Sequence, residues 1–254
     1  SRPVPLHHVS TAAVAVGTTG NPDVLAENRL APAEAVLPSG YVAGKWLAER
    51  LVWSAAERGL PVTVHRPGRI GGDSRTGAGG TDDALWHLVR AMLLLGTAPD
   101  AVRAAEAVVE LTPVDRVAGA VVHIARRPES MGRGHHLTCP TPLPFAVLLD
   151  VLHAAGYPLR TVPLPEWTAA LHTRTDLDLA AAALLSDSVP ALLGLGALRF
   201  DRSNTGAALA GSGVPSPDLD AALLRRYVDH LAGVGFFPPP GPAGGTGPHD
   251  LEAK

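Results

Sequence analysis

The pattern of apolar and polar positions predicts strands early in the chain and helices later. Residues 6–16 form a short, apolar, β-branched run, and residues 61–66 form a second run of the same kind. Between them, residues 41–58 contain no proline and place apolar side chains at helical spacing, with Ser39 as an N-cap and Gly59 just past the end. A strand, a loop, a long helix and another strand make one repeat of a parallel α/β sheet.

The pattern beyond Gly80 is mostly helical. Helices are expected over residues 82–95, 113–125, 145–155, 167–193 and 219–231, with one short strand over residues 136–139. Prolines at 238–240 and paired glycines at 244–245 then indicate a flexible tail. We therefore divide the chain into an α/β portion at 1–80, a mostly helical lobe at 81–235 that also returns strands to the core, and a tail at 236–254.

Composition narrows the classes of function. The 254 residues carry a formal net charge of −3 without a basic stripe, which gives no reason to expect nucleic acid or an anionic membrane as a partner. The single cysteine, Cys139, excludes an internal disulfide and suits a reducing compartment. Apolar runs are too short to cross a bilayer as helices. A cytoplasmic protein is expected.

Tyr41 and Lys45 are the most informative residues. Their spacing of four places both side chains on one face of the predicted helix, one turn apart. A lysine ammonium beside a phenol helps the hydroxyl to give up its proton, which suits a hydride-transfer enzyme. The pair alone is also compatible with an ordinary solvated helix face, so its context has to decide.

Ser10 and Thr11 provide that context. They end the first predicted strand, where a hydroxyl would reach the carboxyl edge of the sheet at which α/β enzymes place their ligands. A hydroxyl there can donate a hydrogen bond to a carbonyl oxygen as negative charge builds on it. The alternative is that the two residues merely finish a strand.

Other polar clusters point less clearly to chemistry. Two pairs of adjacent histidines, at 7–8 and 135–136, have the wrong spacing for a metal site on one face of a strand, so no metal is expected. Three arginines surround the glycine-rich loop at 68–80, and each is either a phosphate ligand or an ion-pair partner and loop anchor: Arg66, Arg69 and Arg75.

A family resemblance connects these residues. Segments 8–11, 39–49 and 65–72 follow one another in the order found in extended short-chain dehydrogenases. The Arg-Pro-Gly-Arg-Ile run at 66–70 and the Leu-Thr-Pro-Val-Asp-Arg run at 111–116 more narrowly resemble the thioester reductase domains that end nonribosomal peptide and polyketide synthetases, and the related domain of carboxylic acid reductases. The resemblance extends from Leu6 to Leu231 and is strongest before Ala125.

The resemblance implies reduction of a carrier-bound acyl or peptidyl thioester by NADPH to an aldehyde, which a second round would convert to an alcohol. In this reading Thr11 polarises the carbonyl, Tyr41 donates the proton, and Lys45 tunes Tyr41 and holds the nicotinamide ribose. The implied partner is a carrier protein with a phosphopantetheine arm. The remaining implied roles are contact with the nicotinamide for Pro67, Gly68 and Ile70, and contact with the substrate for Ser10, Arg69 and Arg75.

The chain departs from the family at its start. The family begins with a βαβ unit whose glycine-rich turn binds the cofactor pyrophosphate at a helix N-terminus. No G-x-G-x-x-G occurs here, and the spaced glycines Gly241, Gly244 and Gly247 lie in the proline-rich tail. We therefore expect the C-terminal part of a Rossmann-like domain, with its N-terminal dinucleotide-binding half on an upstream segment. NADPH binding by this chain alone is then expected to be weak or absent.

Two other functions stay open at this point. One is an extended short-chain dehydrogenase or epimerase acting on another substrate, such as a nucleotide sugar or a sterol. The other is a catalytically idle lobe that docks a carrier protein. An acyl thioester that supports NADPH oxidation would separate the leading hypothesis from both.

Overall fold

The computed structural model describes residues 4–17, 23–28, 30–32, 37, 39–104, 107–173, 198–216 and 218–240. The chain forms two compact units, each assembled from three separate segments. The first unit comprises Ser1–Gly71, Glu110–Thr141 and Leu198–Asp218, and the second comprises Gly72–Val109, Pro142–Ala197 and Leu219–Lys254. This arrangement differs from the consecutive division expected at residues 80 and 235, because the chain returns to the first unit to add a strand and two helices to its sheet.

The first unit is built on a parallel sheet of three strands. The strands are β1 (Leu6–Val9), β3 (Val62–Pro67) and β8 (Arg133–Leu137), in the spatial order β1-β3-β8. In this register His7 lies beside Thr63, and His65 lies beside His135. Every residue of β3 is buried, as expected for a central parallel strand covered on both faces.

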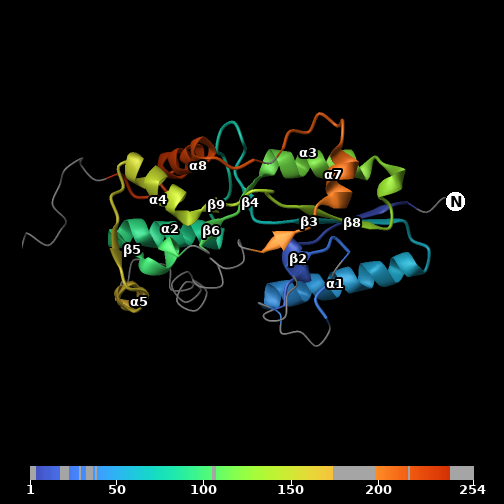
Figure 1. Cartoon of the computed structure of the whole chain (residues 1–254), viewed down its shortest axis with the longest axis horizontal. Coiled ribbons are helices and arrows are strands. Elements are labelled where there is room, and N and C mark those ends of the chain that lie inside the picture. The colour runs from blue at the N-terminus through green and yellow to red at the C-terminus, as the bar shows by residue number, and fades with distance from the viewer. Residues whose placement is uncertain are drawn as a thin grey trace, which may run out of the picture. The chain divides into compact units, whose positions relative to one another are not determined.

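Helices cover the two faces of this sheet (Figure 1). Helix α1 (Gly40–Glu57) lies on one face and α3 (Val114–Ala125) on the other, while α7 (Ser203–Leu209) packs beside β8 and α3. The α3 face buries an apolar cluster made of Val117, Ala120, Ile124, Leu137 and Ala208. The three layers confirm the predicted α/β fold class.

Local capping explains where the first elements begin and end. Ser39 caps α1 as predicted, and its Oγ accepts a hydrogen bond from Val42 N at 3.3 Å. Gly59 adopts a φ of +96° just past the helix, a conformation that favours glycine. The expected strand over 6–16 is too long, because Thr11 caps a 3₁₀ helix at Ala12–Ala15 and β1 stops at Val9.

Short strand pairs complete the first unit. Strand β2 (Val24–Leu25) pairs with β11 (Arg199–Phe200), and β4 (Ile70–Gly71) pairs with β7 (Thr112–Pro113), both in parallel. A second 3₁₀ turn lies at Pro128–Ser130. The pattern of apolar residues does not indicate these strands, because each is only two residues long.

The second unit is mostly helical. Its helices are α2 (Ala84–Leu95), α4 (Phe145–Ala154), α5 (Leu164–His172) and α8 (Ala221–Gly233), with a 3₁₀ turn at Asp100–Arg103. Strand β5 (Thr97–Pro99) pairs with β10 (Arg160–Val162), and β6 (Val108–Val109) pairs with β9 (Leu143–Pro144). The helix expected over 167–193 is observed as far as His172, and residues 174–197 and 241–254 lie outside the described residues.

Helix contacts in the second unit are made by large aromatic side chains. The Trp86 ring meets the rings of Tyr227 and Phe237 edge-on, and the indole Nε1 of the buried Trp167 donates to Thr97 O at 3.1 Å. Gly77 has a φ of +75°, and a Cβ there would lie 2.3 Å from Arg226 O of α8. None of the helices in the described ranges is long and apolar enough to cross a membrane.

Three histidines, one from each strand, line the α3 face of the sheet. The ring centroids of His7 and His65 are 5.9 Å apart, and those of His65 and His135 are 6.1 Å apart. Burial lowers the pKa of His65 to about 4, and the neighbouring histidines add to the effect. Burial, followed by the charge of Arg133, lowers the pKa of His135 to about 4.

These low pKa values predict acid sensitivity. An unfolded histidine takes up a proton near its ordinary pKa of 6.5, whereas folded His65 and His135 resist protonation until about pH 4. The unfolded state therefore binds more protons in this window, and the free energy of unfolding should fall by about 1–2 kcal/mol per histidine from pH 7 to pH 5. Urea unfolding at the two pH values measures the difference. His65→Leu should flatten the dependence, and an unchanged slope would contradict this explanation.

Candidate active site

The first turns of α1 lie at the carboxyl edge of the sheet, where β1 ends. Tyr41 and Lys45 share one face of the helix because four residues separate them. Lys45 Nζ donates a hydrogen bond of 3.1 Å to the carbonyl oxygen of Val9, and Val9 is the last residue of β1. The Tyr41 side chain is 63% exposed. The bond from Lys45 thus fixes this face of α1 beside the residues that follow β1.

Ser10 and Thr11 are those residues. Thr11 Oγ1 accepts a hydrogen bond from Ala13 N at 3.4 Å, so its own hydrogen is free to be donated to another group. Ser10 is tied to the neighbouring strand through its N–H, which donates to His65 O at 2.8 Å. Its side chain is buried, and its Oγ has no hydrogen-bond partner among the described residues. Two hydroxyl groups therefore follow the strand end that Lys45 contacts.

A partly buried carboxylate, Glu110, holds the loop that follows β3. Its Oε2 accepts from Arg69 N at 3.0 Å, and its Oε1 accepts from Cys139 N at 2.8 Å and from Thr112 Oγ1 at 3.3 Å. Burial raises the pKa of Glu110, while these hydrogen bonds act in the opposite direction. Glu110 thereby links the loop after β3, the loop after β8 and strand β7.

Gly68 lies directly against this carboxylate. A Cβ at position 68 would lie 2.6 Å from Glu110 Oε2 and 2.8 Å from Oε1. Pro67 is buried at the end of β3, and Ile70 is 40% exposed. The segment predicted to face a nicotinamide is thus a tightly packed turn with one exposed apolar side chain.

The three arginines have different environments. Arg66 is fully buried and paired with Glu49, so it cannot reach a phosphate in solution. Of the two roles considered for it, Arg66 is therefore an ion-pair partner and not a phosphate ligand. Arg69 is partly buried and anchors the loop through its N–H. Arg75 is exposed in the second unit, where its N–H donates to Asp73 Oδ1 at 3.0 Å. The structure places the other predicted site residues in the first unit, and Arg75 in the second.

The adjacent histidines lie on opposite faces of the sheet. His135 stacks on His65 on the α3 side, whereas His136 faces Arg66 on the α1 side. Burial and the charge of Arg66 lower the pKa of His136 to about 4. Among the residues that the structure describes, no group of three His, Cys, Asp or Glu side chains is arranged to hold a metal ion.

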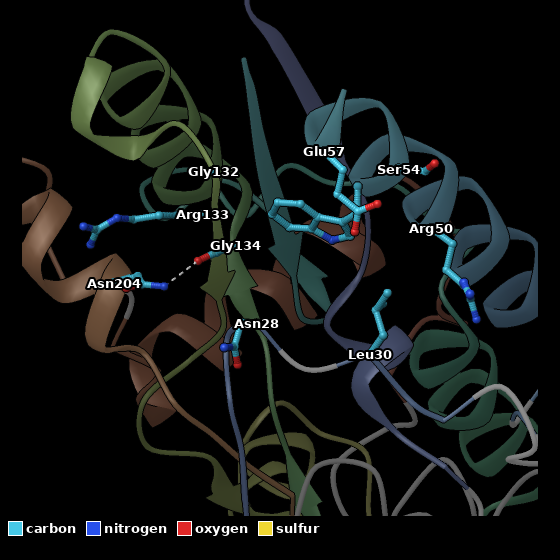
Figure 2. A pocket seen from close by; sticks show the side chains of 10 residues that line it. Asn28, Leu30, Arg50, Ser54, Glu57, Gly132, Arg133, Gly134 and Asn204 are labelled. Atoms are coloured by element: carbon cyan, nitrogen blue, oxygen red, sulfur yellow. Dashed lines mark hydrogen bonds between the residues drawn. The ribbon is translucent and has the colours of Figure 1, made fainter. Parts of the chain in front are cut away.

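A cavity of about 660 Å³ lies elsewhere in the first unit (Figure 2). It borders the second half of α1 and the start of β8, and its lining includes Trp53, Glu57, Gly132 and Asn204. Figure 2 shows the side chains of two further lining residues, Arg50 and Arg133, pointing away from each other. Trp53 is twelve residues along α1 from Tyr41, about 18 Å at 1.5 Å per residue. The cavity is therefore separate from the site at the carboxyl edge.

Two residues of the site's surroundings were missed from the sequence. Glu49 continues the spacing of Tyr41 and Lys45 by four more residues, which is a local signal that could have identified it. Glu110 has no such signal, because the N–H groups that it binds belong to residues 41 positions before it and 29 positions after it.

The fold is that of the extended short-chain dehydrogenases/reductases. Residues 1–121 match the Male sterility protein family of NAD-binding domains, which implies a nicotinamide cofactor. Residues 1–121 thus carry a domain of this family, and the resemblance to the terminal reductase domains of nonribosomal peptide synthetases that the sequence predicted is confirmed by the relatives of the chain.

Relatives of known sequence and structure support this assignment. The isonitrile lipopeptide synthase of Streptomyces coeruleorubidus is 38% identical over 100% of this chain and 17% of its own length. The terminal R domain from the myxalamid PKS-NRPS pathway has 35% identity and a TM-score of 0.80, over 93% of this chain and 60% of that one. A thiolation-reductase di-domain of an archaeal non-ribosomal peptide synthetase shares the fold at 22% identity, with a TM-score of 0.72, over 92% of this chain and 50% of that one. The chain thus spans less than two thirds of each relative.

The contact between Gly68 and Glu110 predicts that Gly68→Ala will be destabilising. The added methyl group must displace a carboxylate that two N–H groups hold, and such overpacking costs about 1–3 kcal/mol in the free energy of unfolding. Thermal or urea unfolding measures the loss.

Gly206→Ala is the matched control. This glycine is an exposed helical residue of α7 with open space around its Cβ position, so alanine should stabilise the protein by about 0.5–1 kcal/mol. If Gly68→Ala were as stable as Gly206→Ala, the packing described around Glu110 would be wrong.

Proposed function

We propose that this chain carries the proton-donating part of an enzyme that uses NADPH to reduce an acyl or peptidyl thioester, held on a carrier protein, to an aldehyde. The observation that supports it most is the bond from Lys45 to Val9, which holds the Tyr41 and Lys45 face of α1 at the strand end followed by Thr11. A proton donor, a cation and a carbonyl-polarising hydroxyl are the groups that carbonyl reduction by hydride requires.

The residues present fit a nicotinamide cofactor. Within the part of the chain that the structure describes, Lys45 Nζ has one acceptor, Val9 O, and an ammonium has two further hydrogens for ribose hydroxyls. The buried Ser10 Oγ has no partner within the described ranges, and Gly68 lets the loop after β3 pack closely against Glu110. Three points stay predictions: the preference for NADPH, the site for the cofactor pyrophosphate on an upstream segment, and the weak cofactor binding of the isolated chain.

The chemistry assigns one task to each residue. A bound nicotinamide cofactor would supply the hydride for the thioester carbonyl carbon. Thr11 Oγ1 donates a hydrogen bond to the carbonyl oxygen as charge builds on it, and Tyr41 Oη gives that oxygen its proton. Loss of the pantetheine thiol then leaves an aldehyde, so one acyl thioester, one NADPH and one proton yield one aldehyde, one thiol and NADP⁺. Lys45 assists the transfer of the proton from the Tyr41 hydroxyl group.

The proposed partner is a carrier protein with a phosphopantetheine arm. Support comes from a solved structural neighbour that is itself a thiolation-reductase di-domain, and from the relative described as a lipopeptide synthase. Arg69 and Arg75 are candidate contacts for the arm because both are cationic and neither is fully buried. Assays with a series of acyl thioesters would identify the acyl chain, and assays with the aldehyde would detect a second reduction to the alcohol.

Tyr41→Phe in the full-length protein tests the proposal. Removing the phenol hydroxyl removes the proton donor, so turnover of an acyl-pantetheine thioester with NADPH should fall by roughly two to four orders of magnitude. Aldehyde formation, followed by chromatography after trapping with a hydrazine, is the measurement.

Tyr157→Phe is the control for this experiment. Tyr157 Oη donates to Pro238 O at 2.8 Å within the second unit, so the same atom is removed from a structural hydrogen bond. Its turnover should stay close to that of the wild type. Near-normal turnover of Tyr41→Phe would refute the role of Tyr41, and consumption of a nucleotide sugar in place of the thioester would favour the epimerase alternative.

A further inference from the structure

The α1 face of the sheet buries an ion pair between Glu49 and Arg66. Both side chains are fully excluded from solvent. Arg66 Nε donates to Glu49 Oε1 and Oε2 at 3.0 and 3.1 Å, and a second guanidinium nitrogen contacts Oε1. The pair joins the middle of α1 to the central strand β3, and a bidentate contact of this kind fixes orientation as well as distance.

Neighbouring groups complete the hydrogen bonding of this pair. Glu49 Oε1 also accepts from Trp53 Nε1 at 2.9 Å, and Arg66 Nη1 donates to Glu27 O at 2.9 Å. His136 Nδ1 lies 2.9 Å from Asp201 O, an acceptor, so this nitrogen carries the proton and Nε2 faces Arg66 Nη1 at 3.4 Å as an acceptor. A buried charge that is paired and bonded in this way is held in one geometry.

Helix α1 has few other buried attachments to the sheet. Of its 18 residues, only Val42 and Glu49 are buried, whereas Leu47 and Leu51 are exposed. Apolar packing is not directional, so it would not by itself fix the rotation or the axial position of such a helix. Among the described residues, its directional contacts with the sheet are the Lys45 bond to Val9 and the Glu49 pair with Arg66, and Trp46 Nε1 donates to Ala31 O of the loop before α1 at 2.9 Å.

Glu49 belongs to the same helix face as the proposed catalytic residues. Tyr41, Lys45 and Glu49 recur every four residues, so Glu49 lies about 6 Å along the axis from Lys45 and about 12 Å from Tyr41. We propose that Glu49 and Arg66 are positioning residues, which hold α1 in the register and rotation that present Tyr41 and Lys45 at the carboxyl edge of the sheet. This proposal rests on the proposed reductase function.

The test replaces both members of the pair in the full-length protein, as Glu49→Leu with Arg66→Met. Removing both charges leaves no unpaired ion, and apolar side chains of similar size commonly preserve a fold at such sites. The double variant should unfold cooperatively like the wild type. Its kcat for NADPH-dependent reduction should drop about tenfold to a hundredfold, because a displacement near 1 Å at the reacting groups is enough for that loss. KM for the thioester should stay close to the wild-type value.

Thr63→Val is the matched control. Thr63 is buried on β3 of the same unit, and its Oγ1 donates to Ser130 O at 3.2 Å, in the turn before β8, so this contact does not involve α1. The variant loses a buried hydrogen bond and should unfold at a lower temperature, while its kcat stays near the wild-type value. The control therefore distinguishes an effect of lower stability on kcat from an effect of moving Tyr41 and Lys45.

A simple aldehyde, used in parallel with the thioester, separates the two proposals. If the wild type reduces both and the double variant keeps the wild-type kcat on both, the positioning proposal is wrong and the proposed function stands. If the wild type reduces only the aldehyde and the double variant loses that activity, the thioester function is wrong and the positioning role stands. A wild type that reduces neither refutes both.

A second variant covers the case in which the double variant does not fold. Glu49→Asp keeps the negative charge beside Arg66 but shortens the side chain by one methylene group, so the pair must shift to stay in contact. A reduced kcat with retained KM and a retained fold is expected. A wild-type kcat for Glu49→Asp would overturn the positioning proposal.

Discussion

Glu49 and Arg66 face each other between the central sheet and helix α1, and water reaches neither side chain. Charges in such a place are tolerated only when each has its partner and its remaining hydrogen bonds, so the strand, the helix and the segment at Glu27 have to fit around the pair. The same geometry determines where the first two turns of α1 lie. The position of Tyr41 and Lys45 therefore depends on an interaction that never touches a substrate.

Carboxylates that are buried or partly buried organise the first unit at three places. Glu49 fixes α1, Glu110 ties together the loops after β3 and β8, and Glu27 accepts from His136 N, Thr205 N and Thr205 Oγ1 at the start of α7. Each one binds groups from segments far apart in the chain. Two of the three hold elements that carry proposed site residues, so the polar interior of this unit serves the site as well as the fold.

The sequence predicted those features that depend on neighbours along the chain. Ser39 and the proline-free run behind it predicted α1, and a spacing of four placed Tyr41 and Lys45 on one face. Long-range pairs could not be predicted in this way: Glu27 and Thr205 are 178 residues apart, and no local pattern connects them. The consecutive domain division differed from the structure for the same reason, since segments 110–141 and 198–218 return to the first unit to cover its sheet.

The central claim is that hydride reaches the carbonyl carbon of a thioester at the site formed by Thr11, Tyr41 and Lys45. The most direct measurement gives the full-length protein NADPH that carries deuterium at the transferable C4 position, together with a carrier-bound acyl thioester, and reads the product by mass spectrometry. The account predicts an aldehyde with one deuterium on its carbonyl carbon. A free carboxylic acid without deuterium would show hydrolysis in place of reduction, and would contradict the account.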